Sequence, residues 1–183
     1  MTATIATQDH GLAHDPHGFK QVMSRLAHSV TIVTSHSPGH GPRGLTCSAF
    51  MSVSADPPIV AAGIHRRSPF LETALESQSF CINVLRDSAE ATAMVFATRG
   101  EDRFSQIGWR RSQHTGAPIL TDACVAHFDC ALVDTVSSGD HVLVFGLVRE
   151  AIQGCDVPPL VHCQRAFGSW TPGIDDNTTG EQA

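Results

Sequence analysis

The sequence predicts a single, mainly β domain, built as an antiparallel sheet or barrel with a few short helices packed outside it. About six or seven segments are β-prone, whereas only three short segments have helical spacing. The predicted strands do not alternate regularly with helices, which argues against a doubly wound parallel sheet. The length of 183 residues is typical of one domain.

In the first third of the chain, capping and turn residues bound the predicted elements. Asp15-Pro16 is typical of an N-cap followed by proline in the first turn, and apolar side chains at helical spacing predict an amphipathic helix over residues 17–27. β-prone segments separated by turn residues predict three strands and one turn-rich connection. The strands cover residues 29–35, 44–54 and 58–65, and the connection covers 36–43.

The rest of the chain continues in the same way. Ser68-Pro69 repeats the cap and proline and predicts a second short helix, and Asp87 to Glu90 resembles a capping box that begins a third helix ending near Ala97. The polar segment 98–118 is predicted to be mostly loop. Further strands are expected at about 79–85, 123–136, 141–152 and 159–163, with a hairpin turn at 137–140.

We expect the folded domain to cover residues 17–170, between a flexible leader at 1–16 and a flexible polar tail at 171–183. The leader has no apolar core, so it does not resemble a signal peptide. Six cysteines without a secretory signal do not imply disulfides, and the cytoplasm is the expected compartment.

The composition argues against two classes of partner. The net charge of −6 gives no electrostatic reason to expect binding to nucleic acid or to an anionic membrane. No run of about 18 apolar residues is present, so no transmembrane helix is expected.

The most informative segment is the predicted strand at 44–54, which carries small residues and hydroxyls where a core strand would carry valine or isoleucine. A strand loses packing stability when it carries such small residues. Two explanations stay open: a flat or phosphorylated ligand lies against the bare backbone, or the strand crosses another sheet segment closely. The small residues are Gly44, Ser48, Ala49, Ser52 and Ser54.

Two other patterns are rejected as sites. Gly39 to Gly44 formally matches the glycine pattern of dinucleotide-binding folds, but the residues that follow are β-prone rather than helical, so it is predicted to be a hairpin loop. Cys124, His127 and Cys130 alternate faces along a strand and do not converge on one metal ion. No metal site is expected.

No nucleophilic triad or buried carboxylate pair stands out, so if the protein is an enzyme, a cofactor is expected to supply the chemistry. Arg66 and Arg67 place two cations beside the Ser68 hydroxyl at a predicted helix start, where the helix dipole also favours an anion. His141 follows Gly139-Asp140 at a hairpin end, and Arg165 and Phe167 lie near the end of the fold.

The order of these segments resembles the short-chain flavin reductases, the NAD(P)H-dependent reductase components of two-component flavin monooxygenases. The resemblance runs from about residue 17 to 168. The segments that carry it are Phe19 to Met23, Val30 to Thr34, Gly44 to Ser48, Ser52 to Pro58, Ser79 to Leu85, Phe96, Asp102 to Phe104 and Gly139 to His141.

The resemblance implies a split β-barrel of the FMN-binding type, a homodimer, and a flavin, FMN or FAD, lying along the barrel. The segment 46–49 would contact the isoalloxazine, mainly through backbone amides, and the two serines that follow would lie toward the ribityl chain and phosphate. Three residues near the second helix would complete the phosphate end. The implied flavin-binding residues are Thr46, Cys47, Ser48, Ala49, Phe50, Ser52, Ser54, His65, Arg66 and Ser68.

The resemblance further implies that NADH or NADPH donates a hydride to the flavin, with His141 as the catalytic residue beside the nicotinamide and Arg165 and Phe167 on the nucleotide. Reduced flavin would then pass to a separate oxygenase component. Two alternatives stay open: a flavin carrier without turnover, and an FMN-bound oxidoreductase that acts directly on a small organic substrate. The sequence does not decide between FMN and FAD or between NADH and NADPH.

Overall fold

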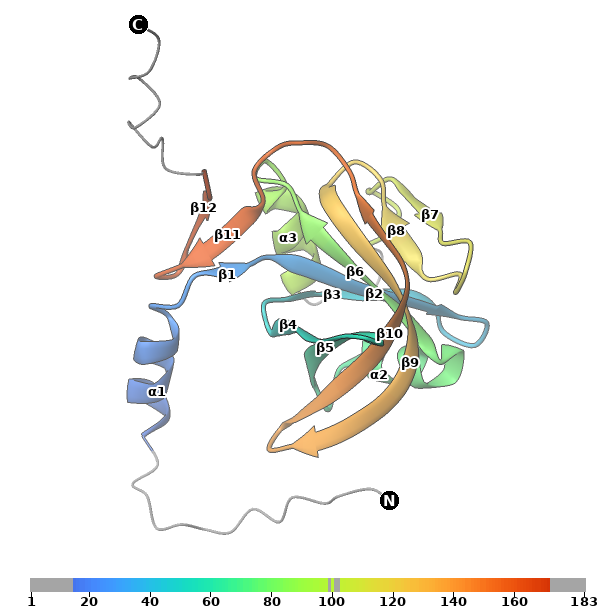
Figure 1. Cartoon of the computed structure of the whole chain (residues 1–183). Coiled ribbons are helices and arrows are strands. Elements are labelled where there is room, and N and C mark those ends of the chain that lie inside the picture. The colour runs from blue at the N-terminus through green and yellow to red at the C-terminus, as the bar shows by residue number, and fades with distance from the viewer. Residues whose placement is uncertain (1–14, 99, 101–102, 172–183) are drawn as a thin grey trace, which may run out of the picture.

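The computed structural model describes residues 15–98, 100 and 103–171. Most of the expected leader, nearly all of the expected tail and Asp102 lie outside this part. The described chain is a mainly β antiparallel barrel with helices outside it, as predicted (Figure 1). The helices are α1 (Pro16–Met23), α2 (Pro69–Ser77) and α3 (Glu90–Ala97). The strands are β1 (His28–Ser29), β2 (Thr31–Ser37), β3 (Gly41–Cys47), β4 (Phe50–Ala55), β5 (Pro58–His65), β6 (Ser79–Leu85), β7 (Trp109–Arg111), β8 (Pro118–Leu120), β9 (Cys124–Ser138), β10 (His141–Gln153), β11 (Leu160–Cys163) and β12 (Ala166–Ser169).

The main sheet has seven strands in the order β3-β2-β6-β9-β10-β5-β4, and all of its pairs are antiparallel. β3 and β4 follow one another in sequence but lie at opposite edges of this sheet. The prediction of one strand over 44–54 is therefore wrong, because the segment pairs with β2 before Ser48 and with β5 after Ala49.

Residues 47–49 form the seam at which the two edges of the sheet meet. The Gly63 amide on β5 donates to the Ala49 carbonyl at 2.8 Å, and the Thr31 hydroxyl on β2 donates to the Cys47 carbonyl at 2.6 Å. Each bond holds the seam to the strand next to one edge, β2 on one side and β5 on the other, while the chain itself joins the edge strands β3 and β4 through residues 48–49. β5 also approaches this segment closely, since a Cβ atom on Gly63 would lie 3.1 Å from the Ala49 Cβ. Small side chains here fit a close crossing, one of the two explanations left open, and do not decide against the other.

Two large apolar clusters and a small third one, of Cys81, Ala117 and Ile119, fill the interior of the described chain. The first lies inside the barrel and includes Phe70 of α2, Phe80 and Val144. The second lies between the sheet and α3 and includes Leu85 and Phe96. Burial of these large apolar side chains supplies the main driving force for the fold.

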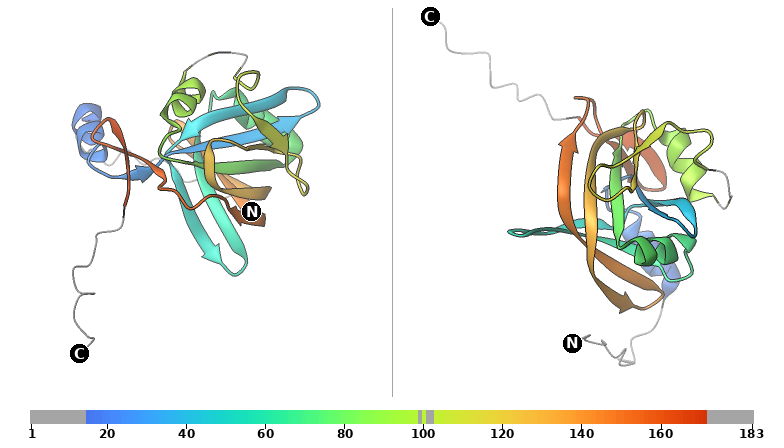
Figure 2. Two further views of the ribbon diagram at one scale, coloured as in Figure 1. Left: turned by 90° about the horizontal axis from the view of Figure 1, so that it is seen from above. Right: turned by 90° about the vertical axis from the view of Figure 1, so that its right-hand side faces the viewer.

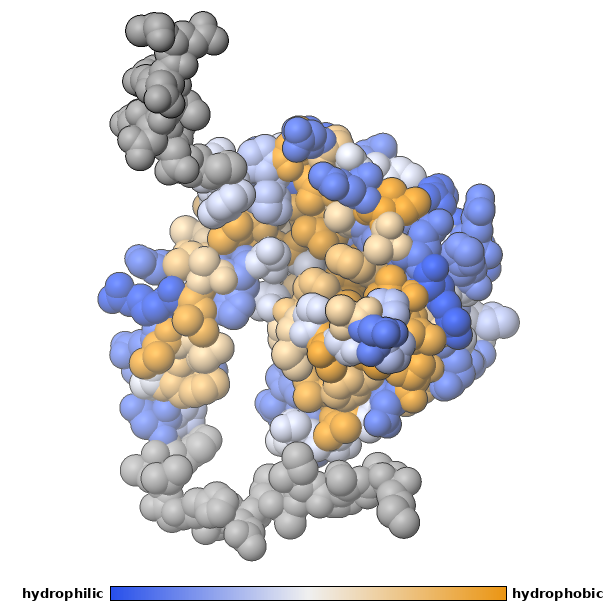
Figure 3. Space-filling model, in the orientation of Figure 1, coloured by the Kyte–Doolittle hydropathy of each residue, from blue (hydrophilic) through white to orange (hydrophobic). Residues whose placement is uncertain are grey.

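Helix α1 differs from the other helices because it buries none of its residues. Asp15 caps it as predicted, accepting from the His17 and Gly18 amides, but it ends at Met23 rather than at residue 27. Phe19 and Val22 are 66% and 69% exposed. In Figure 1 and the left view of Figure 2, α1 stands away from the barrel, joined to it through β1, and Figure 3 shows apolar surface along it.

Smaller differences concern caps and short strands. The expected capping box before α3 is wrong, since Ala89 is the N-cap and no side chain caps the helix. The β7–β8 hairpin lies within and just after the segment predicted to be mostly loop, and β12 was not predicted. Among the described helices, none has the length and apolarity needed to cross a bilayer.

Candidate functional site

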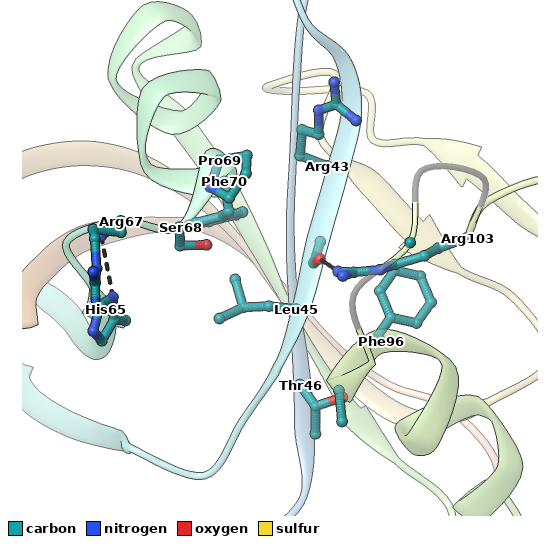
Figure 4. Close-up of a pocket in the computed structure, with 13 residues that line it drawn as sticks. Arg43, Leu45, Thr46, His65, Arg67, Ser68, Pro69, Phe70, Phe96 and Arg103 are labelled. Carbon is teal, nitrogen blue, oxygen red and sulfur yellow. Dashed lines mark hydrogen bonds between the residues drawn. The ribbon is translucent and has the colours of Figure 1, made fainter.

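A cavity of about 400 Å³ opens between β3 and the turn that leads from β5 into α2 (Figure 4). The end of α3 and the segment after it complete its wall. Thr46, the residue directly before the seam, is part of the cavity lining, so the cavity lies next to the seam. It is lined by Arg43, Gly44, Leu45, Thr46, His65, Arg67, Ser68, Pro69, Phe70, Phe96, Ala97, Gly100 and Arg103.

The β3 wall is fixed by contacts with α3 and with Arg103. A Cβ atom on Gly44 would lie 2.8 Å from the Phe96 ring, so glycine lets the ring pack against the bare strand. The Thr46 hydroxyl donates to the Ala93 carbonyl of α3 at 2.5 Å. Arg103 donates through one Nη atom to the Gly44 carbonyl at 2.7 Å and through the other to the Thr98 carbonyl at 2.5 Å. This wall is thus held by polar contacts independent of any ligand.

The opposite wall is the start of α2. Ser68 is its N-cap residue, but its side chain makes no capping hydrogen bond, and in Figure 4 the hydroxyl points toward Leu45 across the cavity. The Arg67 amide donates to Nδ1 of His65 at 3.1 Å. The positive end of the helix and a free hydroxyl therefore face the same space, as in an anion site.

Three arginines, Arg43, Arg67 and Arg103, make the cavity strongly cationic. Every ion pair among the described residues joins a histidine to a carboxylate, so no described carboxylate neutralises these arginines. The Nε atoms of Arg43 and Arg103 are buried without a hydrogen-bond partner in the described chain. Burial lowers the pKa of Arg103, and the nearby charge of Arg43 lowers it further. The cavity thus fits a phosphorylated ligand, which would supply the missing acceptors.

His65 also belongs to a cluster with Asp140 and His141 at the rim of the cavity. His141 pairs with His65 across β10 and β5, and their rings meet edge to face with centroids 5.4 Å apart. His141 Nδ1 lies 2.7 Å from an Asp140 carboxylate oxygen, and this hydrogen bond lowers the pKa of Asp140. Because the ionised carboxylate can only accept, His141 holds a proton on Nδ1 and leaves Nε2 for another partner.

The structure brings only some of the predicted site residues to the cavity. Thr46, His65 and Ser68 line it, and His141 touches the rim through His65. The seam begins directly after Thr46, at Cys47. Burial raises the pKa of the Cys47 thiol, so the thiol stays protonated. Other predicted residues are outside the cavity lining: Cys47, Ser48, Ala49, Phe50, Ser52, Ser54, Arg66, Arg165 and Phe167.

Two of the outlying residues lie on the β11–β12 hairpin. Phe167 meets His162 with ring centroids 5.2 Å apart and packs against the second core cluster. Arg165 is exposed in the turn with φ of +64°. The hairpin is a separate feature from the cavity lining.

Sequence reasoning missed the roles of three residues of the cavity: Arg43, Phe96 as part of its wall, and Arg103 as a cation of the site. Arg67 was one of the two cations predicted at the helix start, although it was not among the implied flavin-binding residues. Arg43 lay in the predicted turn and Arg103 in the predicted loop, and only the fold brings them together.

A second cavity, of about 450 Å³, lies where the start of β9 meets the end of β10. Most of its lining is apolar, it contains no arginine or lysine, and none of the predicted site residues lies in it. Among the described residues, no cluster of three or more histidine, cysteine or acidic side chains is arranged to hold a metal ion.

Comparison with known proteins gives a family for the chain. Residues 23–171 match the family model described as flavin reductase like domain. A flavin reductase (NADH) from Kitasatospora aureofaciens is 37% identical over 161 residues, which are 87% of this chain and 84% of that protein. A flavin reductase (NADPH) from Lentzea aerocolonigenes is 33% identical, over 84% of this chain and 89% of that one.

A solved structure resembles the whole barrel. Nitrilotriacetate monooxygenase component B from Mycobacterium thermoresistibile superposes with a TM-score of 0.79 at 30% identity, covering 91% of each chain. The expectation of a split barrel, in the fold of the flavin reductases, is confirmed.

Proposed function

Because the chain belongs to the flavin reductase family, we propose that it is an NAD(P)H:flavin oxidoreductase whose flavin site is the arginine-lined cavity and the adjoining seam. A bound flavin would supply the hydride chemistry, accepting from the reduced nicotinamide. The observation that carries this proposal is the cavity itself. It combines a bare strand with three arginines that no described carboxylate neutralises, as a flat phosphorylated ligand requires.

We place the phosphate of the flavin at the start of α2, with His65, Ser68 and the neighbouring arginines around it. The isoalloxazine would lie along residues 46–49, where small side chains leave backbone groups accessible, and Phe50 follows in the same segment. Ser52 and Ser54 would lie toward the ribityl chain. Amides held in place by the barrel can stabilise negative charge that develops on the flavin ring.

His141 is proposed to position the nicotinamide, with Arg165 and Phe167 serving the rest of the nucleotide. The support for His141 is its hydrogen bond to Asp140, which fixes the ring and leaves Nε2 available. The Arg66 amide also donates to the Asp140 carbonyl at 3.0 Å and ties this turn to the β5–α2 turn. A fixed imidazole beside the cavity can orient a substrate without being consumed.

His141→Ala is expected to slow NADH-dependent flavin reduction by about tenfold, since one orienting contact is lost, and to leave the FMN Kd unchanged. Rapid mixing of the flavin-loaded protein with NADH, compared with an FMN titration, measures both. His114→Ala, an exposed histidine paired with Glu150 away from the cavity, is the control. If flavin reduction by NADH is as fast in the His141 variant as in the wild type, His141 only shapes the turn and does not position the nicotinamide.

Ser48→Asp tests the seam as a flavin surface. A carboxylate placed there would repel the electron-rich ring or phosphate, so the FMN Kd is expected to rise about tenfold or more. Ser169→Asp, which adds the same charge on exposed β12, should not change it. Titration of flavin absorbance or fluorescence measures both, and equal affinities would remove the seam from the site.

We further propose a homodimer in the cytoplasm. The dimer is supported by the exposed apolar residues of α1, together with Met51 and Val53 on β4, which are 50% and 46% exposed. A second copy would cover such surfaces. All six cysteines are free, as suits a reducing compartment.

Reduced flavin is proposed to pass to a separate oxygenase component. The support is the similarity to a protein named as component B of a monooxygenase. A steady-state assay of NADH and NADPH oxidation tests the activity directly. Turnover that depends on added free FMN or FAD supports the reductase, whereas flavin binding without turnover would leave only a carrier.

A further inference from the structure

The cationic groups of the cavity fall into two sets on opposite walls (Figure 4). One set is Arg67 with the Ser68 hydroxyl at the start of α2. The other is Arg43 on β3 with Arg103 on the segment after α3. A phosphate monoester has one anionic centre, which the first set could hold, and the second set lies apart from it on the β3 side of the cavity.

The second set has no counter-ion in the described chain. Both Arg103 Nη groups are engaged by backbone carbonyls, which accept hydrogen bonds without neutralising the charge. The Nε atoms of both arginines are buried and unpartnered. Two guanidinium groups brought together in a partly buried place repel one another, and an anion between them removes that cost.

We propose that Arg43 and Arg103 form a second phosphate subsite, for a phosphate that FMN lacks. This inference rests on the proposed flavin reductase function. Within each pair of substrates, one member carries a phosphate that the other lacks: FAD carries a second phosphate beyond that of FMN, and NADPH carries a 2′-phosphate that NADH lacks. Both present the same chemistry to a pair of arginines, which bind phosphate oxygens in a planar, forked geometry.

Arg43→Gln is the informative variant, because the Arg43 side chain makes no hydrogen bond among the described residues. Replacing Arg103 would also remove its hydrogen bonds to the Gly44 and Thr98 carbonyls and could disturb the cavity wall. Without any NAD(P)H present, FMN and FAD are titrated against the wild type and the variant. We expect the FAD Kd to rise about tenfold, the scale of one hydrogen bond to a charged group, while the FMN Kd stays within about twofold. A thermal melt confirms that the variant is folded.

The second arm separates the two sources of the phosphate. At saturating FMN, the KM values for NADPH and NADH are compared in the same pair of proteins. A rise for NADPH alone, with FAD binding unchanged, keeps the subsite and assigns it to the 2′-phosphate. A rise in the FAD Kd alone assigns it to the flavin pyrophosphate.

Two further variants give the contrast. Arg67→Gln, in the first set, should weaken FMN and FAD equally, and Arg149→Gln, exposed on β10 outside the cavity, should weaken neither. The subsite is overturned if Arg43→Gln weakens FMN as much as FAD, or if it changes neither FAD binding nor the NADPH preference. The titrations need no turnover, so Arg43-dependent FAD binding in a protein that oxidises no NAD(P)H would refute the reductase function and keep the subsite.

Discussion

Replacing Arg67 and Ser68 together by alanine is expected to raise the KM for FMN by about 100-fold while kcat stays within about threefold. Both side chains line the wall at the start of α2, where the flavin phosphate is proposed to bind. That phosphate is remote from the reacting ring. Binding energy lost equally from the ground state and the transition state appears in KM and not in kcat.

Riboflavin provides the control for this prediction because it lacks the phosphate. Its KM should be the same in the wild type and in the double variant. Arg66→Ala provides a second control, since Arg66 is adjacent in sequence but outside the cavity lining. If Arg66→Ala raises the FMN KM and the double variant does not, the phosphate belongs at Arg66. If riboflavin is affected as strongly as FMN, no phosphate contact exists at this wall.

Gly146→Ala is expected to lower the free energy of unfolding by about 1–3 kcal/mol, toward the upper end of that range. Gly146 is buried on β10 and faces Phe80 and Cys130, two members of the first core cluster. A Cβ atom there would lie 2.5 Å from the Phe80 ring and 2.7 Å from the Cys130 Cβ, both fully buried. Neither neighbour can move without displacing the packed interior, since protein cores are close-packed.

Urea denaturation of the two proteins measures this difference. Gly168→Ala is the matched control, because a Cβ atom on this β12 residue would have no neighbour within 4 Å. Its free energy of unfolding should be close to that of the wild type. Equal stability of the Gly146 variant would mean that β10 can shift away from Phe80, contrary to the packing described.

The sequence predicted elements well where local chemistry bounds them. The strand over 58–65 and the strand over 79–85 have the expected limits, because proline, helix caps and glutamine in a left-handed turn stand at their ends. The break at Ser48 and Ala49 has no such marker. Both halves of the segment are equally β-prone, and the change of partner strand depends on pairing with residues far away in sequence.

Only those residues of the site that stand in a local sequence pattern could be predicted. Thr46 and Ser68 stand in local patterns, a bare strand and a helix start, and the structure brings both to the cavity. Arg43 and Arg103 lie 60 positions apart in the chain, and both line the cavity together with Phe96. No local pattern distinguishes them from solvated surface arginines, which is the ordinary environment of that residue type.

The seam at residues 47–49 ties ligand binding to the integrity of the barrel. The hydrogen bonds that hold the seam to β2 and β5, accepted by the Cys47 and Ala49 carbonyls, belong to the segment proposed to carry the flavin ring. An opening of the barrel along this line separates the strands that shape the binding surface, so the opened molecule loses its affinity. A ligand bound to the closed form therefore adds its binding free energy to the work of opening the barrel. If the flavin binds at the seam as proposed, the free energy of opening the barrel rises with the concentration of free flavin.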